Sequence, residues 1–407
     1  MPSRRVITEL DEWPRHQTID TFDMVTNAAP GWSDGYWHCV GDPNGEVNLI
    51  TALRLYHNTN VIDAYVIAAT ADGKQYNVRA TRRLRPNIDD LRVGPFSMDI
   101  IRGHRTLKLG LDENPHQVEF DILWESAAPP YDEAPGLRSW ADGRLAGERS
   151  NIVQLGNLSG YLKIGPREYN FKVEDGWVGA KDHSWGLGDT GWGEKPHPFA
   201  APRVGPRRSY WGDPGARHWS LIRFSDRSMY YAFRHHNDGS HLATGTGGNI
   251  LELGTIHSRI DYPYDSGKEG WAYKDVEVIS TEWEDNLPRM KGAQIHFTKP
   301  DGKVDRFKVD IISKPVYMQG GGYWGGWNDK LGRGVYRGDD VLEGEVWDIS
   351  HPVKVFDETG KTEIKQKPGG HFAELYGRLT NLDDPNDVGF GLIEIVFNEE
   401  YQGIKAV

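Results

Sequence analysis

The sequence lacks most of the features that mark disulfide-bonded, nucleic-acid-binding and membrane proteins. Cys39 is the only cysteine among 407 residues, which excludes an internal disulfide and any metal site built from several thiolates. No apolar run approaches the roughly 18–20 residues that cross a bilayer, and the first residues, MPSRRVITELDEW, lack the apolar core of a secretory signal. Acidic side chains outnumber basic ones by 59 to 47 without a long basic run, so nucleic acid is not an expected partner. We expect a cytoplasmic globular protein with no transmembrane segment.

Long helical patterns are also scarce, and the dominant local signal is that of β-strands. Val118–Ile122 and Phe307–Ile311 alternate apolar and polar residues, as strands with one dry face do. Asn48–Tyr56 and Val61–Thr70 are apolar at successive positions, which indicates strands buried on both faces. Pairs such as Asp301-Gly302 lie between the runs and favour tight hairpin turns. The sequence therefore predicts an all-β protein built from antiparallel barrels or sandwiches, with few short helices.

The length predicts two or three domains. The stretch 186–215 is dense in Gly, Pro and Trp and separates two β-rich halves, so we predict domains at 1–195 and 196–407. The Pro-rich Ala127–Gly136 is expected to be a linker or a long surface loop. Leu137–Arg149 is the one segment expected to form a short helix.

The most distinctive segment combines an acid, an imidazole and two indoles within ten residues, Trp177–Gly186 (WVGAKDHSWG). Histidine is the side chain best suited to proton transfer near pH 7, and a carboxylate beside it can orient it or raise its pKa. We therefore consider His183 an acid–base group and Asp182 its orienter or a proton donor. The alternative interpretation is a structural aromatic corner in which Asp182 caps a turn.

This part of the chain resembles the AttH/CrtC-like family, on the residues Gln154, Gly160-Tyr161-Leu162, Tyr169, Gly176 and Asp182–Gly186 (DHSWG). Gly389–Glu394 (GFGLIE) is similar to the C-terminal strand of uncharacterised members. The family includes carotenoid 1,2-hydratase (hydroxyneurosporene synthase) and kievitone-hydratase-like proteins. The resemblance implies two calycin-like (lipocalin-like) β domains with a hydrophobic pocket at or near their interface.

In the carotenoid hydratases, a His-x-Trp pair and a downstream Tyr-x-Asp pair are associated with acid–base hydration of a carbon–carbon double bond. His183-Ser184-Trp185 matches the first pair, whereas Tyr210-Trp211-Gly212-Asp213 is one residue longer than the second. The resemblance implies Asp213 as a general acid, in competition with Asp182.

Glu394 is a further candidate for the proton donor. Strand alternation places it on the same face as Phe390, Leu392 and Val396. A carboxylate among apolar neighbours has a raised pKa, which keeps a proton donor protonated at neutral pH. The alternative is a salt-bridged glutamate at a domain contact.

Aromatic residues near these groups are candidates for binding the substrate. The glycine-rich run 320–327 (GGGYWGGW) provides a pocket wall or lid, or alternatively a turn that plugs a barrel end. The predicted substrate-binding residues are Trp177, Trp185, Tyr210, Trp211, Tyr323 and Trp324. His235, His236 and His241 surround a predicted hairpin turn and are interpreted as solvated, so no metal site is expected.

These observations favour an acid–base enzyme acting on a hydrophobic small molecule, such as a terpenoid, carotenoid, steroid or aromatic compound. It would be a hydratase or dehydratase, an isomerase or a cyclase, with the catalytic residues among Asp182, His183, Asp213 and Glu394. No cofactor is expected, because proton transfer in a dry pocket supplies the required stabilisation. The alternatives are a lipophilic-ligand-binding protein that performs no reaction and, less favoured, a hydrolase using Ser184 or Ser33.

Overall fold

The computed structural model describes residues 12, 25, 27, 29–141, 144–187, 215–236, 257–366, 373–398 and 400–405, and this part is almost entirely β-structure. Its longest helical segment, η4, has four residues. The short 3₁₀ turns are η2 (Val173–Asp175), η3 (Tyr264–Ser266), η4 (Met318–Gly321) and η5 (Tyr323–Gly325). None of the described helices is long and apolar enough to span a membrane. The predicted all-β fold class is confirmed.

The first sheet contains fourteen strands among the described residues, joined in the order β22-β21-β4-β3-β2-β1-β12-β10-β8-β7-β6-β5, with β9 and β11 pairing to β10. The described pairings in it are antiparallel. Its strands are β1 (Trp32–Gly41), β2 (Val47–Tyr56), β3 (Val61–Thr70), β4 (Lys74–Arg83), β5 (Arg92–Val93), β6 (Phe96–Arg102), β7 (Thr106–Leu111), β8 (Val118–Ser126), β9 (Tyr131–Ala141), β10 (Arg144–Ile164), β11 (Arg167–Phe171), β12 (Val178–Leu187), β21 (Val341–Asp348) and β22 (Phe356–Asp357).

The second sheet contains ten described strands in the order β16-β15-β14-β13-β24-β23-β19-β18-β17, with β20 pairing to β23. A separate two-stranded sheet, β25 (Glu400–Tyr401) and β26 (Ile404–Lys405), follows it in the chain. The strands of the second sheet are β13 (Gly215–Phe224), β14 (Ser228–His236), β15 (His257–Asp261), β16 (Trp271–Ala272), β17 (Asp275–Trp283), β18 (Met290–Thr298), β19 (Val304–Ile311), β20 (Val316–Tyr317), β23 (Ala373–Asn381) and β24 (Val388–Asn398).

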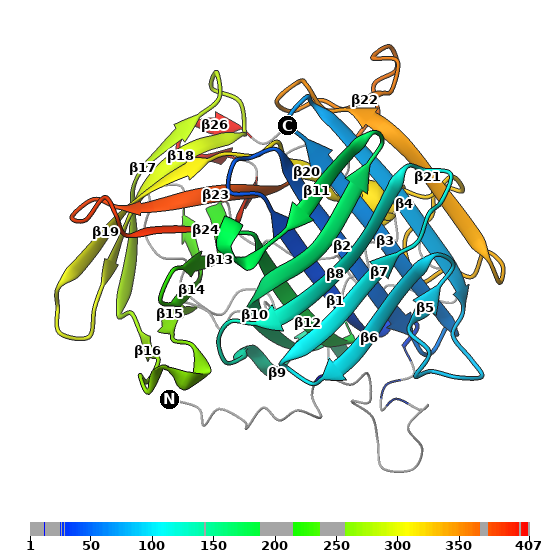
Figure 1. Ribbon diagram of the computed structural model, residues 1–407, viewed down its shortest axis with the longest axis horizontal. Helices are drawn as coiled ribbons and strands as arrows, with labels where there is room; N and C mark the ends of the chain where they lie inside the picture. The colour runs from blue at the N-terminus through cyan, green and yellow to red at the C-terminus, as the bar shows by residue number, and fades with distance from the viewer. Residues whose placement is uncertain are drawn as a thin grey trace.

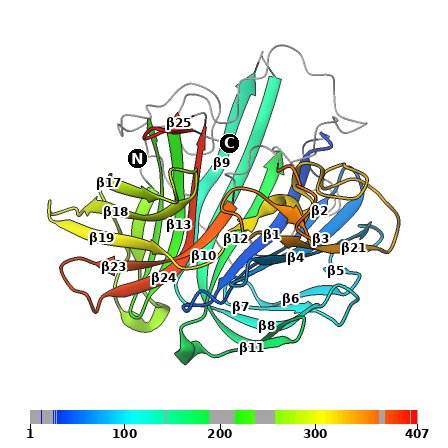
Figure 2. The same ribbon diagram turned by 90° about the horizontal axis from the view of Figure 1, so that it is seen from above.

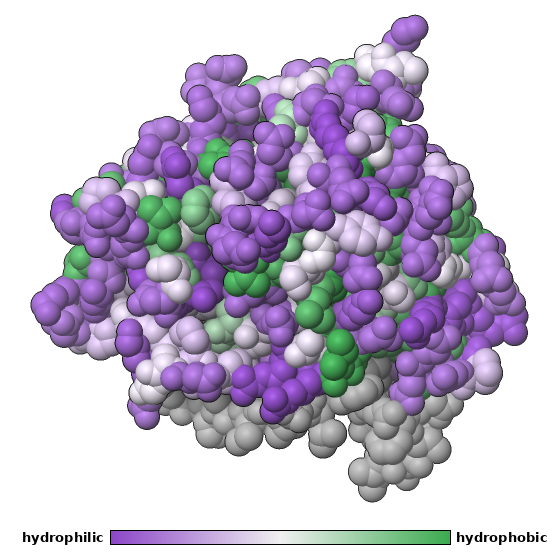
Figure 3. Space-filling model, in the orientation of Figure 1, coloured by the Kyte–Doolittle hydropathy of each residue, from purple (hydrophilic) through white to green (hydrophobic). Residues whose placement is uncertain are grey.

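Both sheets curl into half-barrels that lie side by side (Figure 1). Seen from above, their strands fan apart on either side of a contact that β1, β10 and β12 make with β13 and β24 (Figure 2). The face in Figure 3 is largely hydrophilic with scattered apolar patches, as is usual for a globular surface. The contact between the two sheets is thus the main internal boundary of the molecule.

Three apolar clusters follow from this arrangement and from the alternation of side chains along each strand. On β1, Tyr36 and Val40 point into the first half-barrel, whereas Trp37 and Cys39 point toward the second sheet. On β24, Ile393 and other residues of that face fill the second half-barrel. β2 and β3 are buried on both faces, as predicted, because one face lines the half-barrel and the other packs between the sheets.

Two local expectations were wrong. The helix expected at Leu137–Arg149 is instead part of β9 and β10, in which Leu137 pairs with Arg149 and Trp140 with Leu145. Glycines within this segment weaken a helix, and cross-strand pairing satisfies the backbone groups instead. The Pro-rich segment expected to be a linker or loop contributes its residues from Tyr131 onward to β9.

The expected boundary between residues 195 and 196 lies outside the described residues, and the division into two domains stays a prediction. The two sheets do not follow it strand for strand. β21 and β22, from the second half of the sequence, extend the first sheet through the pairing of β21 with β4.

The close approach of the sheets at Gly41 gives a testable prediction. A Cβ atom at this position would lie 2.0 Å from the ring of Tyr376. We expect Gly41→Ala to lower the free energy of unfolding by about 1–3 kcal/mol, measured by urea denaturation, because the ring must move. In a Tyr376→Ala background the same change should have little further effect. Equal losses in both backgrounds would contradict the proposed contact.

Candidate functional site

The strand β12 divides the most distinctive sequence motif between two opposite faces. Lys181 and His183 point into the first half-barrel, where Lys181 lies over the ring of Trp124. Asp182 and Ser184 alternate with them and point toward the second sheet. The neighbouring residues Asp182 and His183 therefore do not face one another, and Asp182 is not the orienter of His183.

The partner of His183 is Asp34, on the adjacent strand β1. His183 Nε2 lies 2.9 Å from Asp34 Oδ1, and both side chains are completely buried. The ring of Tyr36 stacks on the imidazole with centroids 4.2 Å apart, and the tilted ring of Trp185 lies with its centroid 5.3 Å from that of the imidazole. His183 is therefore enclosed, oriented and separated from the carboxyl groups on the other face of β12.

A buried ion pair lies beside this histidine. The Lys181 ammonium group donates a hydrogen bond to the Glu12 carboxylate, which also accepts one from the backbone N–H of His104 at 2.6 Å. Burial alone would raise the pKa of Glu12, but the charge of Lys181 and the bond with His104 outweigh it and the pKa falls. Burial lowers the pKa of Lys181, and Glu12 opposes this shift. We call Glu12, Asp34, Tyr36, His104, Lys181 and His183 the barrel-interior cluster.

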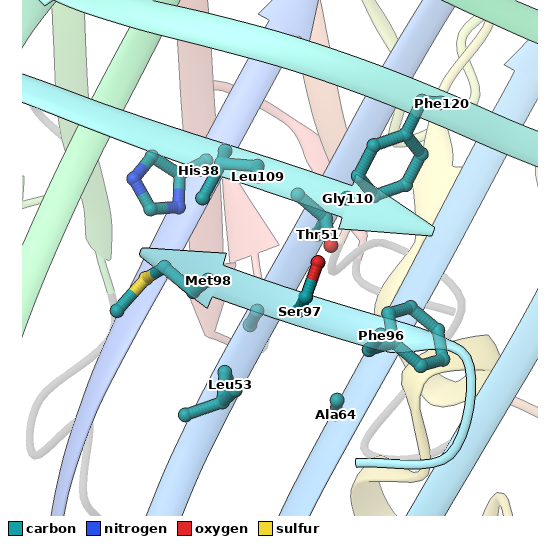
Figure 4. A pocket seen from close by; sticks show the side chains of 11 residues that line it. His38, Thr51, Leu53, Ala64, Phe96, Ser97, Met98, Leu109, Gly110 and Phe120 are labelled. Carbon is teal, nitrogen blue, oxygen red and sulfur yellow. The ribbon is translucent and has the colours of Figure 1, made fainter. Parts of the chain in front are cut away.

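A small pocket, partly open to solvent, lies in the same half-barrel (Figure 4). Burial and the charge of Lys181 lower the pKa of His38, which lines this pocket, to about 3, so its imidazole is neutral. The pocket contains none of the residues predicted from the sequence to be catalytic. Its other lining residues are mainly apolar: Ala52, Leu53, Ala64, Phe96, Met98, Leu109 and Phe120, with Thr51, Ser97 and Gly110.

A second polar cluster occupies the contact between the sheets and contains four carboxyl groups. We call Glu133, Asp182, Glu374 and Glu394, with Arg149 and Arg217, the inter-sheet cluster. Glu133 accepts hydrogen bonds from the Asn151 amide and, at 3.1 Å, from the indole nitrogen of Trp219. Burial raises the pKa of Glu133, and the nearby charge of Asp182 adds to this shift.

Glu374 and Glu394 lie directly opposite one another on β23 and β24. Burial raises the pKa of Glu374 well above its ordinary value, and the charge of Glu394 and a hydrogen bond between the two carboxyl groups raise it further. The guanidinium group of Arg217 donates a hydrogen bond to Glu394. Glu374 is therefore a carboxyl group with a raised pKa beside an arginine-bound partner, which favours the protonated form of Glu374.

Glu394 lies on the strand face that alternation predicts, and its role as a proton donor stays a prediction. Phe390 and Leu392 pack in the layer between the sheets, on the face predicted for Glu394. Glu394 is also salt-bridged, as the alternative interpretation held. The carboxyl group with the clearly raised pKa is its partner Glu374, which the sequence analysis missed because nothing local marks it.

Asp182 is the most accessible carboxylate of the inter-sheet cluster, with 15% of its side chain exposed. Arg149 approaches it at 3.8 Å. Among the described residues, Asp182 Oδ1 and Glu374 Oε2 are buried oxygens without a hydrogen-bond partner. Buried polar atoms are rarely left unpaired, so these two oxygens are available to a ligand or to water.

Aromatic rings surround this cluster. Trp37 and Trp219 face one another across the two sheets with centroids 6.1 Å apart, and Tyr230 packs against Trp219. Of the predicted substrate-binding residues, Tyr323 and Trp324 pack against this layer, and Tyr323 Oη lies 3.1 Å from Tyr65 Oη.

The other predicted aromatic residues do not join the cluster. Trp177 packs inside the first half-barrel against Phe171, and Trp185 belongs to a small cluster with Trp32 and Ile152. Tyr210, Trp211 and Asp213 lie outside the described residues.

The chain is similar in fold to several solved structures. One is a protein described as a putative AttH from Nitrosomonas europaea, at 9% identity and a TM-score of 0.47, covering 92% of this chain and 93% of that one. Another is kievitone hydratase from Nectria haematococca, at 11% identity and a TM-score of 0.47, covering 97% and 93%. A third is CghA with Sch210972, at 10% identity and a TM-score of 0.46, covering 90% and 89%. AttH and kievitone hydratase, which the sequence resemblance named, are thus among the similar structures.

The curated proteins contain no significant match to this sequence. A family model does match, over residues 7–361, which is most of the chain. This match includes all of the barrel-interior cluster and the β12 face of the inter-sheet cluster, but not Glu374 or Glu394. The chain belongs to the family of unknown function DUF8625.

Proposed function

We propose that this protein is an acid–base enzyme that acts on a hydrophobic small molecule at the inter-sheet cluster. It would act as a hydro-lyase or as an isomerase or cyclase, and it needs no redox cofactor because only protons move. The observation that carries the proposal is the carboxyl pair Glu374 and Glu394, buried among aromatic rings, in which the pKa of Glu374 is raised well above its ordinary value. A protonated carboxyl group held in an apolar site is a suitable general acid at neutral pH.

The proposed contacts with the substrate are the unpartnered oxygens of Glu374 and Asp182. In a dehydration, the proton of Glu374 moves to the substrate hydroxyl, and the C–O bond breaks so that oxygen leaves as water. Asp182 takes a proton from the adjacent carbon as the C=C bond forms. Glu374 then takes a proton from solvent and Asp182 releases its proton to solvent, so both groups return to their starting forms, and hydration is the same sequence in reverse. Trp37 and Trp219 provide electron-rich faces for a cationic centre.

This proposal changes the role expected for His183. Because its imidazole is fully buried and bonds Asp34 on the opposite face of β12, we assign it to holding β1 and β12 in register. The carboxyl groups replace it as the proton-transfer groups. The sequence resemblance to the AttH/CrtC-like family supports the same class of reaction, and a terpenoid, carotenoid, steroid or aromatic compound remains the proposed substrate.

The test is incubation of the full chain with a panel of such compounds in H₂¹⁸O and, separately, in D₂O, followed by mass spectrometry. We expect at least one compound to gain or lose water with ¹⁸O incorporation, or to isomerise or cyclise with deuterium incorporation at carbon. Compounds that are bound and recovered unaltered and free of both isotopes would contradict the enzyme and favour a lipophilic-ligand-binding protein.

A further inference from the structure

A half-buried arginine crosses one strand of the first sheet on the face turned toward the second sheet. Arg54 on β2 donates hydrogen bonds to Ser33 Oγ at 3.0 Å and to Ser184 Oγ at 2.7 Å. Gly35 lies between Arg54 and Ser184 in the pairing of β2, β1 and β12. A Cβ atom on Gly35 would lie 2.8 Å from Arg54 Cβ, so the glycine makes room for the arginine to reach β12.

The charge of Arg54 is not balanced by a carboxylate. Within the described parts of the chain, no acidic group lies within ion-pair distance of it, and the two groups to which it donates hydrogen bonds are neutral hydroxyls. Burial lowers the pKa of Arg54, and the positive charges of Arg333 and Arg149 add to this effect while Tyr56 and Tyr323 oppose it. A half-buried guanidinium group that bonds only neutral hydroxyls, near two further arginines, is a favourable position for an anion.

Arg54, Ser33 and Ser184 together have hydrogen-bond donors that the bonds between them do not use. A guanidinium group has more N–H groups than these two bonds use. The oxygens of Ser33 and Ser184 accept bonds from Arg54, so their own hydroxyl hydrogens can be donated elsewhere. Donors from β1, β2 and β12 thus converge on one point.

We propose that Arg54, Ser33 and Ser184 form a subsite that binds the carboxylate of an amphipathic ligand. The planar guanidinium group fits a carboxylate in a bidentate arrangement. A doubly charged phosphate is less suitable, because Asp182 lies on the same face of β12, two residues from Ser184. The apolar body of the ligand would lie against Tyr323 and Trp324.

The subsite also defines a substrate class. Asp182 connects it to the inter-sheet cluster through Arg149, which lies near both Asp182 and Arg54. If the proposed function holds, the substrate is a hydrophobic acid whose carboxylate is bound by Arg54 while its reacting carbon faces Glu374 and Asp182. This identification of the ligand as substrate rests on the proposed function, whereas carboxylate binding itself does not.

The experiment is isothermal titration of the full chain with benzoate and with benzyl alcohol, its neutral counterpart. We expect saturable benzoate binding that weakens at least about 10-fold in Arg54→Gln and is partly retained in Arg54→Lys, with benzyl alcohol unaffected by either change. Arg83→Gln, which removes an exposed arginine paired with Asp339, is the matched control and should bind benzoate as the wild type does. Ser184→Ala keeps the charge and should also weaken benzoate binding, which provides a test if Arg54→Gln does not fold.

Two results would overturn the subsite: no saturable benzoate binding by the wild type, or equal binding by the wild type, Arg54→Gln and Ser184→Ala. Failure of the subsite and failure of the proposed function are distinguishable. Benzoate binding by the wild type that depends on Arg54, together with an absence of turnover by the wild type for every compound of the panel, would refute the proposed function and leave the subsite standing. Glu374→Gln should keep this benzoate binding.

Discussion

Replacing Glu374 by glutamine is expected to lower turnover of any substrate found in the panel by about 10²–10⁴-fold. Glutamine preserves the shape of the side chain but has no proton to transfer. Because glutamine can still hydrogen-bond Glu394, the free energy of unfolding should change little. Steady-state kinetics with Glu277→Gln as control, an exposed glutamate of β17, measures the effect. Full activity of Glu374→Gln would remove Glu374 from the mechanism.

The pH dependence of this activity has a definite sign. Since the pKa of Glu374 is raised, the acid form persists above the ordinary carboxyl range, and the Glu374-dependent rate should fall as the pH rises through the raised value. The contribution of Glu374 to the stability of the fold also falls as the pH rises. The folded protein binds the proton of Glu374 more tightly than the unfolded chain does. The stabilisation is therefore complete below the pKa that Glu374 has in the unfolded chain, and it is lost as the pH rises through the higher pKa of the folded protein.

The second large effect is expected in the barrel-interior cluster. Glu12→Ala leaves the ammonium group of Lys181 buried without its carboxylate, which should lower the free energy of unfolding by about 3–5 kcal/mol. The depressed pKa of Glu12 means that its contribution is present above the unfolded carboxyl pKa and is lost as the pH falls toward the folded value. Urea denaturation at neutral and at acidic pH measures both effects.

A double variant provides the control for this ion pair. Glu12→Ala combined with Lys181→Met removes both charges, so it should recover much of the stability that the single change loses. The loss in Glu12→Ala should also shrink at acidic pH. A single-variant loss below about 1 kcal/mol, or a double variant less stable than Glu12→Ala, would contradict a buried pair at this position.

The sequence predicts the strands of this protein better than their partners. Alternation correctly placed Glu394 on the same strand face as Phe390 and Leu392, because the face to which a strand residue points depends only on its position along that strand. The hydrogen-bond partner of His183 is Asp34, 149 positions away in the sequence. The local pattern instead favoured Asp182, the residue next to His183, although adjacent residues of a strand point to opposite faces. The pairing of β21 with β4 likewise joins segments that no local signal connects.

The residues of the candidate site were likewise hard to predict when they depend on strand pairing. A buried carboxyl group leaves no periodic pattern in the sequence. Glu374 is recognised as a candidate only because β23 places it opposite Glu394. Arg54 appears in the sequence as one basic residue of a buried strand. Its significance depends on Gly35 and Ser184, which two strand pairings bring beside it.

The protonation state of Glu374 is measured directly by a ¹³C NMR titration of the glutamate side-chain carboxyl groups, with Glu374→Gln and Glu133→Gln to assign the buried signals. We expect the Glu374 signal to report a protonated carboxyl group at neutral pH and to titrate only above the ordinary glutamate range. This signal should be absent from Glu374→Gln and present in Glu133→Gln. A Glu374 signal that titrates as an ordinary carboxylate, fully ionised at neutral pH, would contradict the proposed proton donor.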